Sequence, residues 1–92
     1  MNIKGLNFVK TCAASPEQYE VFDSIGEHVG YVRLRWGRLT CEYPDVGEEY
    51  IYVTRIGDGW TGEFESQEQR ENHLNAIADK IIERIGKNNE NI

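Results

Sequence analysis

The sequence predicts an α+β domain, in which an antiparallel meander of four to five strands carries one C-terminal amphipathic helix on one face. Two observations predict this fold. Residues 31–43, YVRLRWGRLTCEY, separate apolar from charged side chains on both arms of a hairpin. Near the C-terminus an apolar stripe repeats at spacings of three and four: Leu74, Ile77, Ala78, Ile81 and Ile85. Neither apolar surface can be shielded from water by its own element, so we expect the two to pack against each other in one core.

The N-terminal half is expected to supply three strands. Residues 3–12 form the first, because apolar and polar side chains alternate there. Ser15 followed by Pro16 resembles a capping box with proline at the first helical position, so a helical turn within residues 15–20 is an alternative to a plain turn. Residues 18–23 favour a strand, and a short loop leads into the next strand, 28–36.

A two-residue loop, Gly37-Arg38, is expected to join the arms of the hairpin, because glycine suits the first central position of a type II′ turn. In this register Trp36 faces Leu39, Leu34 faces Cys41 and Val32 faces Tyr43 on the core side. On the other side Arg35 faces Thr40 and Arg33 faces Glu42. This single register therefore places the apolar side chains of both strands on one face and the polar and charged side chains on the other.

The last predicted strand is 49–56, and its orientation is left open: either Tyr50 and Tyr52 or Ile51 and Val53 face the core. A glycine-rich breaker at 57–59 follows and is expected to let Trp60 pack under the helix. Residues 60–65 are either a short edge strand or a lead-in to the helix.

The helix is predicted over residues 67–85. Ser66 and Gln69 form a capping box at its start, and Gly86 suits a left-handed residue just after its end. Residues 1–86 thus form a single domain, and 87–92 form a polar, flexible tail.

Charge and composition narrow the range of partners and cellular locations that we expect. The chain has 16 acidic and 10 basic residues and a net charge of −6, so its overall field repels a nucleic acid. No signal peptide and no apolar run of about 20 residues is present, which predicts a cytoplasmic protein without a membrane partner. We expect reduced thiols at Cys12 and Cys41, and a monomer or weak dimer.

The sequence shows no chemical signature. Gly57, Gly59 and Gly62 match a dinucleotide-binding pattern, but no second parallel strand follows the helix. The soft metal ligands, Cys12, Cys41, His28 and His73, lack the spacing of a zinc site. We therefore expect no enzymatic activity, no catalytic residue, no metal and no cofactor.

One surface stands out as a candidate interaction face. It holds Tyr31, Arg33, Arg35 and Arg38, joined by Tyr50 and Tyr52 if Ile51 and Val53 point inward. Three explanations remain open. The face is an ordinary solvated one with an Arg33–Glu42 ion pair, a protein-binding surface, or a stacking platform for single-stranded nucleic acid.

Three segments, CAASPEQYEVFD, GYVRLRWGRLTCEYPDVGEEYIY and GDGWTGEF, carry a resemblance. Over residues 12–85 the chain resembles a group of small uncharacterised proteins carried by phages and integrative conjugative elements of Gram-positive bacteria. No activity is assigned to that group, so no site residue carries over. The resemblance implies an accessory role in a mobile element. We therefore expect a non-enzymatic module that acts through a protein partner, with nucleic-acid binding as the alternative.

Overall fold

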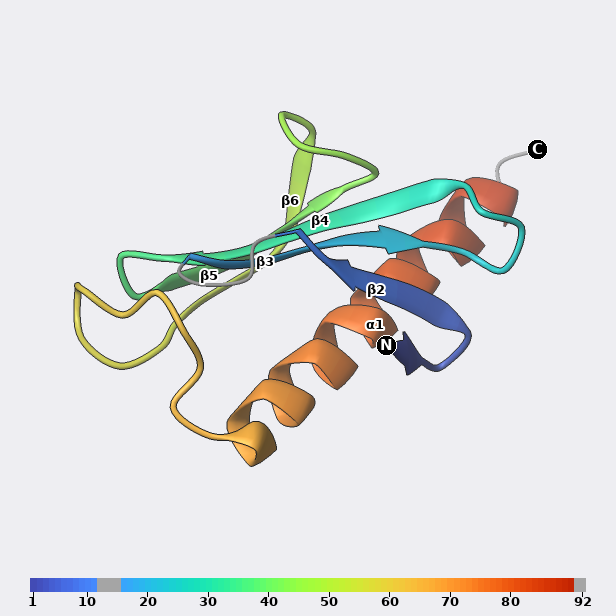
Figure 1. The fold of residues 1–92 in the computed structure, drawn as a ribbon. Helices are drawn as coiled ribbons and strands as arrows, with labels where there is room; N and C mark the ends of the chain where they lie inside the picture. Colours follow the sequence, from blue (N-terminus) through green and yellow to red (C-terminus); the bar gives the residue numbers. More distant parts are fainter. Residues whose placement is uncertain (12–15, 91–92) are drawn as a thin grey trace.

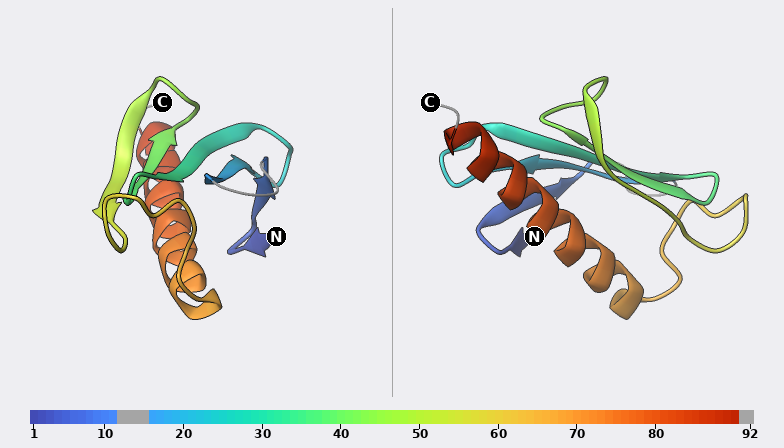
Figure 2. Two further views of the ribbon diagram at one scale, coloured as in Figure 1. Left: turned by 60° about the vertical axis from the view of Figure 1, so that its left-hand side comes forward. Right: turned by 180° about the vertical axis from the view of Figure 1, so that it is seen from behind.

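The computed structural model describes residues 1–11 and 16–90. Within these residues the strands are β1 (Asn2–Ile3), β2 (Leu6–Lys10), β3 (Glu17–Phe22), β4 (His28–Arg35), β5 (Arg38–Tyr43) and β6 (Glu49–Arg55), followed by α1 (Gln67–Glu90). Each strand pairs antiparallel with the next, and α1 crosses one face of the sheet (Figures 1 and 2). The predicted α+β meander is confirmed. Its six strands are one more than the upper end of the predicted range.

The additional strand comes from the N-terminus. Residues 3–12 were expected to form one strand, but Lys4 and Gly5, with φ of 54° and 86°, turn the chain between β1 and β2. Both central residues of a type I′ turn take positive φ, and glycine at the second favours it. Cys12 and Ser15 lie outside the described residues. Residues 17–20 belong to β3, so they hold no helical turn.

The predicted register of the β4–β5 hairpin is wrong by two residues. Trp36 and Gly37 form the turn, with φ of 54° and 69°, so Arg35 opposes Arg38 and Leu34 opposes Leu39. The loop is therefore type I′, with glycine at its second central position. A shift of two residues keeps every strand side chain on its face, so Val32, Leu34, Leu39 and Cys41 face the core as predicted. Trp36, however, leaves the core and is 56% exposed.

A bulge in the β5–β6 ladder resolves the orientation of β6. Cys41 opposes Tyr52, whereas the next residue, Glu42, opposes Tyr50, so Ile51 is the extra residue. Tyr50 and Val53 consequently lie on the sheet face opposite α1, and Tyr52 lies on the side of the helix. Neither of the two alternatives considered for this strand is correct, because both assumed an unbroken period of two.

The core lies between the sheet and α1. Leu34, Leu39, Leu74, Ile77 and Ile81 are all fully buried, as predicted. The close approach of helix to sheet depends on a glycine. A Cβ at Gly30 in β4 would lie 2.9 Å from Ile81 Cδ1. The side chain of Ile81 therefore packs directly against the backbone of β4 at Gly30.

The helix begins where predicted and ends later. The Gln69 N–H donates to Ser66 Oγ at 3.0 Å, which confirms the N-cap. Gly86 lies within α1, so the predicted end at Ile85 is wrong. Residues 91 and 92 of the predicted tail lie outside the described residues. Residues 60–65 form no strand and serve as the lead-in to α1. No helix in the described ranges is long and apolar enough to cross a membrane.

Candidate binding surface

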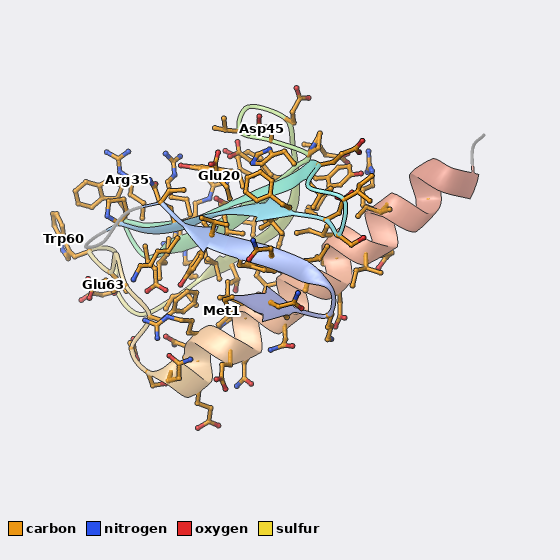
Figure 3. The ribbon with its side chains drawn as sticks, turned by 45° about the vertical axis from the view of Figure 1, so that its right-hand side comes forward. Met1, Glu20, Arg35, Asp45, Trp60 and Glu63 are labelled. Carbon is orange, nitrogen blue, oxygen red and sulfur yellow. The ribbon has the colours of Figure 1, made fainter. Side chains whose placement is uncertain are left out.

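A row of three arginines crosses the sheet on the face opposite α1. Arg35 in β4 opposes Arg38 in β5, and Arg38 in turn opposes Arg55 in β6. Arg33, two residues before Arg35, lies on the same face. Figure 3 shows Arg35 extending from the sheet away from the helix. Like charges directly opposite one another destabilise a sheet, so this row is unfavourable for folding. We call Arg33, Arg35, Arg38 and Arg55 the arginine face.

The arginine face lacks the partners that neutralise other basic side chains of the molecule. Lys4, Arg70, Arg84 and Lys87 each form an ion pair with a carboxylate. Among the described residues, no member of the arginine face does. The predicted Arg33–Glu42 pair is wrong, because the true register sets Arg33 opposite Thr40. Four positive charges thus face solvent without compensation.

Aromatic rings hold three of these guanidinium groups in place. Arg33 lies 5.9 Å from the ring centroid of Tyr31, Arg35 lies 5.7 Å from Trp36, and Arg38 lies 5.3 Å from Tyr50. Cation–π contacts at these distances are attractive but leave the N–H donors free for a ligand. The face is therefore ordered and still able to donate hydrogen bonds.

The arginine face surrounds a hollow of about 300 Å³, which we call the basic hollow. Its lining consists of the four arginines together with Trp36, Thr40 and Tyr50. Guanidinium groups bind carboxylates and phosphates with paired hydrogen bonds. The shape and chemistry of the basic hollow therefore suit an anionic group.

The predicted interaction residues divide between the two sides of the sheet. Tyr31, Arg33, Arg35, Arg38 and Tyr50 share the outer face, as expected. Tyr52 does not join them. Its hydroxyl lies 2.9 Å from Nδ1 of His73 in α1, and burial raises its pKa. Val53 and Arg55 lie on the outer face in its place, and the bulge at Ile51 is what brings them to the same face as Tyr50.

The other half of the outer face is acidic. His28 lies between two carboxylates, with Nε2 at 3.6 Å from Glu20 and Nδ1 at 3.3 Å from Asp45. These three residues are the one cluster in the described part with ligand atoms close enough for a metal. Each ring nitrogen lies near a different carboxylate, and neither nitrogen has a hydrogen-bond partner among the described residues. Figure 3 places Glu20 and Asp45 on the same side as Arg35.

Both tryptophans of the chain lie beside the arginine face, Trp36 in the β4–β5 turn and Trp60 in the loop after β6. Trp36 and Trp60 meet at a centroid distance of 5.7 Å, with their ring planes at 76°. Trp60 is 80% exposed and does not pack under the helix, contrary to the sequence-based expectation. The Trp60 loop instead docks on the β4–β5 turn, where the Gly37 N–H donates to Thr61 O at 2.7 Å.

Glu17 in β3 and Arg70 in α1 form a buried ion pair that the sequence did not suggest. Glu17 is 1% exposed and accepts hydrogen bonds from Arg70 Nε at 2.6 Å, from Arg70 Nη2 at 3.1 Å and from the Tyr19 hydroxyl. The Phe64 N–H also donates to it. Burial raises the pKa of Glu17, but these donors outweigh burial and hold it below the usual value. Because the partners of the Glu17 carboxylate come from β3, α1 and the loop before α1, the cluster fastens these segments to one another.

Comparison of the chain with models of known families, with curated proteins and with solved structures finds no match.

Proposed function

We propose that this protein is a non-enzymatic binding module that recognises an acidic segment of a partner protein through the arginine face. The observation that carries the proposal is the Arg35–Arg38–Arg55 row, which has no carboxylate partner among the residues that the structure describes. Such a row is unfavourable in the free protein and becomes favourable when an anion neutralises it. Arginine, tyrosine and tryptophan are also the residues that dominate protein-binding surfaces.

The surroundings of the arginine face favour a protein over a nucleic acid. Four of the ten basic residues lie in it, so the rest of the chain is more acidic than the net charge of −6 suggests. Tyr31 lies two residues before Arg33 in β4, on the same outer face. Its partners on the neighbouring strands are Glu20 in β3 and Glu42 in β5. A polyanion that leaves the basic hollow in this direction meets negative charge, whereas a short acidic segment does not.

The cellular setting is part of the proposal. The resemblance to small proteins of phages and conjugative elements supports an accessory role in a mobile element of a bacterium. The composition supports a cytoplasmic location. An adjacent relaxase, replication or host-defence gene would identify the process.

Two fluorescein-labelled probes test the function: octaglutamate, and an oligothymidylate of eight nucleotides. Their affinities are measured by anisotropy at about 50 and 200 mM salt, a range over which phosphate-dependent binding falls steeply. We expect octaglutamate to bind. The variant Arg38→Glu/Arg55→Glu should lower its affinity by about tenfold or more, the effect of losing one strong contact.

The matched control is Lys10→Glu/Lys80→Glu, which makes the same change in net charge at exposed lysines without ion pairs in the described structure. It should retain most of the binding. Equal losses in both double variants would reduce the effect to overall charge and contradict the proposal. Tighter binding of the oligonucleotide, abolished by Arg38→Glu/Arg55→Glu, would establish nucleic-acid binding in its place.

A further inference from the structure

Trp36 occupies a position that its backbone conformation makes unfavourable. It is the first central residue of the β4–β5 turn, with φ of 54°. Asn, Asp and Gly adopt this conformation readily, whereas a bulky side chain there is an outlier. The Trp36 side chain is 56% exposed, so burial in the core does not explain it either. Strained, exposed residues of this kind cluster at binding sites.

The turn that carries Trp36 is held rigidly. The Gly37 N–H donates to Thr61 O at 2.7 Å, and the Ile56 N–H donates to Gly37 O at 2.8 Å. A Cβ at Gly37 would lie 2.0 Å from the carbonyl oxygen of Asp58, so turn and loop are in direct backbone contact. Trp60 lies on that loop. The backbone that carries both indole rings is therefore anchored, and a pre-organised backbone lowers the cost of binding.

A second hollow, of about 400 Å³, opens beside the two rings, and we call it the tryptophan hollow. Its lining is Pro16, Arg35, Trp36, Trp60 and Gly62. Arg35 and Trp36 also line the basic hollow, so the two hollows share a wall. A cationic hollow and a largely apolar hollow thus lie next to each other on one surface.

We propose that the tryptophan hollow seats a bulky apolar side chain of the same acidic segment that binds the arginine face. This inference rests on the proposed function and specifies its ligand: an extended acidic peptide that carries one large apolar residue, such as phenylalanine. Carboxylates occupy the basic hollow, and the apolar residue packs against Trp36, Trp60 and Pro16. The perpendicular rings form two walls of a pocket, and Arg35 lies over Trp36, so a flat nucleobase finds less stacking surface on Trp36.

The test uses a series of acidic octapeptides in which a single phenylalanine moves along the run of glutamates, each paired with the same peptide carrying alanine. Tryptophan emission reports binding at either hollow, because Trp36 lines both. The difference between each phenylalanine peptide and its alanine partner isolates the tryptophan hollow. At one position or more, phenylalanine should raise the affinity of the wild-type protein about tenfold over alanine, as one well-seated anchor does.

Trp60→Ala should abolish the advantage of phenylalanine while leaving the affinity for the alanine peptides unchanged, because Trp60 does not line the basic hollow. Trp36→Asn should also abolish the advantage, and because Trp36 lines both hollows and lies beside Arg35, it should lower the affinity for the alanine peptides as well. Arg38→Glu/Arg55→Glu should instead lower the affinity for both kinds of peptide. Far-UV circular dichroism and the Tm of each variant confirm that it is folded. Because asparagine suits the conformation of residue 36, this variant separates binding from folding.

The inference is overturned if phenylalanine and alanine peptides bind the wild type equally at every position, or if Trp36→Asn keeps the difference. Binding of the acidic peptides would still stand in either case, so the proposed function would survive. If no acidic peptide binds, the proposed function fails and this inference fails with it. An oligothymidylate that quenches tryptophan emission, with no response to any peptide, would assign the hollow to a nucleobase and contradict the inference.

Discussion

Glu17 in β3 and Arg70 in α1 lie 53 residues apart in the sequence and form a bidentate ion pair, with N–O distances of 2.6 and 3.1 Å. The carboxylate is almost fully buried, and its other acceptor sites are taken by the Tyr19 hydroxyl and the Phe64 N–H. Arg70 also lies 5.6 Å from the ring centroid of Phe64. This cluster ties the start of the helix and the loop before it to the sheet. The same loop carries Trp60.

Removing Arg70 should destabilise the protein strongly. Arg70→Met leaves the Glu17 carboxylate buried without its counter-ion, which lowers the free energy of unfolding by about 3 kcal/mol. Adding Glu17→Leu should recover part of that loss, because it removes the unpaired buried charge; the recovery is incomplete because the Tyr19 hydroxyl and the Phe64 N–H lose their acceptor. Urea denaturation of the single and double variants measures both effects. A loss of less than about 1 kcal/mol in Arg70→Met would show that water solvates the carboxylate in the folded protein.

Acid should weaken the fold partly through Glu17. Its pKa is lowered on folding: burial acts against the shift, and the hydrogen bonds from Arg70, Tyr19 and Phe64 produce it. The resulting stabilisation is complete above the unfolded-state pKa of about 4.3 and disappears as pH falls through the folded-state pKa. Urea midpoints between about pH 6 and 2.5 should therefore fall less steeply in Glu17→Gln than in the wild type. Glu63→Gln, an exposed site, is the control and should follow the wild type.

Gly30 should be intolerant of a larger residue because of Ile81. An added Cβ would lie 2.9 Å from Ile81 Cδ1 and 3.4 Å from Val21 Cβ. We expect Gly30→Ala to lower the free energy of unfolding by about 1–3 kcal/mol, the usual range for an overpacked core. Ile81→Val removes Cδ1 and by itself costs about 0.5–1.5 kcal/mol. The double variant should be more stable than the sum of the single effects implies. Strict additivity in this mutant cycle would mean that the helix shifts away from the sheet.

The two central residues of the β4–β5 turn should respond in opposite ways. Trp36→Asn should leave the free energy of unfolding unchanged or raise it by about 1 kcal/mol, because asparagine accepts positive φ. Gly37→Ala should lower it by well over 1 kcal/mol, since the methyl group would meet the Asp58 carbonyl at 2.0 Å. Thermal unfolding of the two variants measures the difference. A destabilised Trp36→Asn would show that the indole supports the fold.

Cys41 should be unreactive in the native protein. The thiol is fully buried, and burial raises its pKa to about 12. Iodoacetamide reacts with the thiolate, so labelling at pH 8 should proceed only through unfolding. Cys12→Ser leaves Cys41 as the single cysteine, and mass spectrometry then follows its alkylation with and without urea. Rapid labelling of the native variant would place Cys41 at the surface and contradict the assignment of the core face.

Periodicity and capping determined much of the architecture. The alternation of Leu34 and the charged residues around it, and the three-and-four spacing of Leu74, Ile77 and Ile81, predicted the two apolar surfaces that meet in the core. Ser66 marked the start of the helix correctly. These features are local, because a side chain's face depends only on its place in a strand or helix.

The candidate site required the tertiary structure. Arg35, Arg38 and Arg55 form a row because two ladders fix their registers, and the sequence-based register set Arg35 opposite Thr40. The loop at 56–61 holds the turn through Gly37, and the bulge at Ile51 reverses the face of Tyr52. Glu17 and Arg70 likewise meet only when the helix docks. The β4–β5 register depends on where the turn falls, at Trp36-Gly37. The loop at 56–61 and the Glu17–Arg70 pair depend on contacts between segments distant in sequence. The alternation of apolar and polar side chains encodes none of these outcomes.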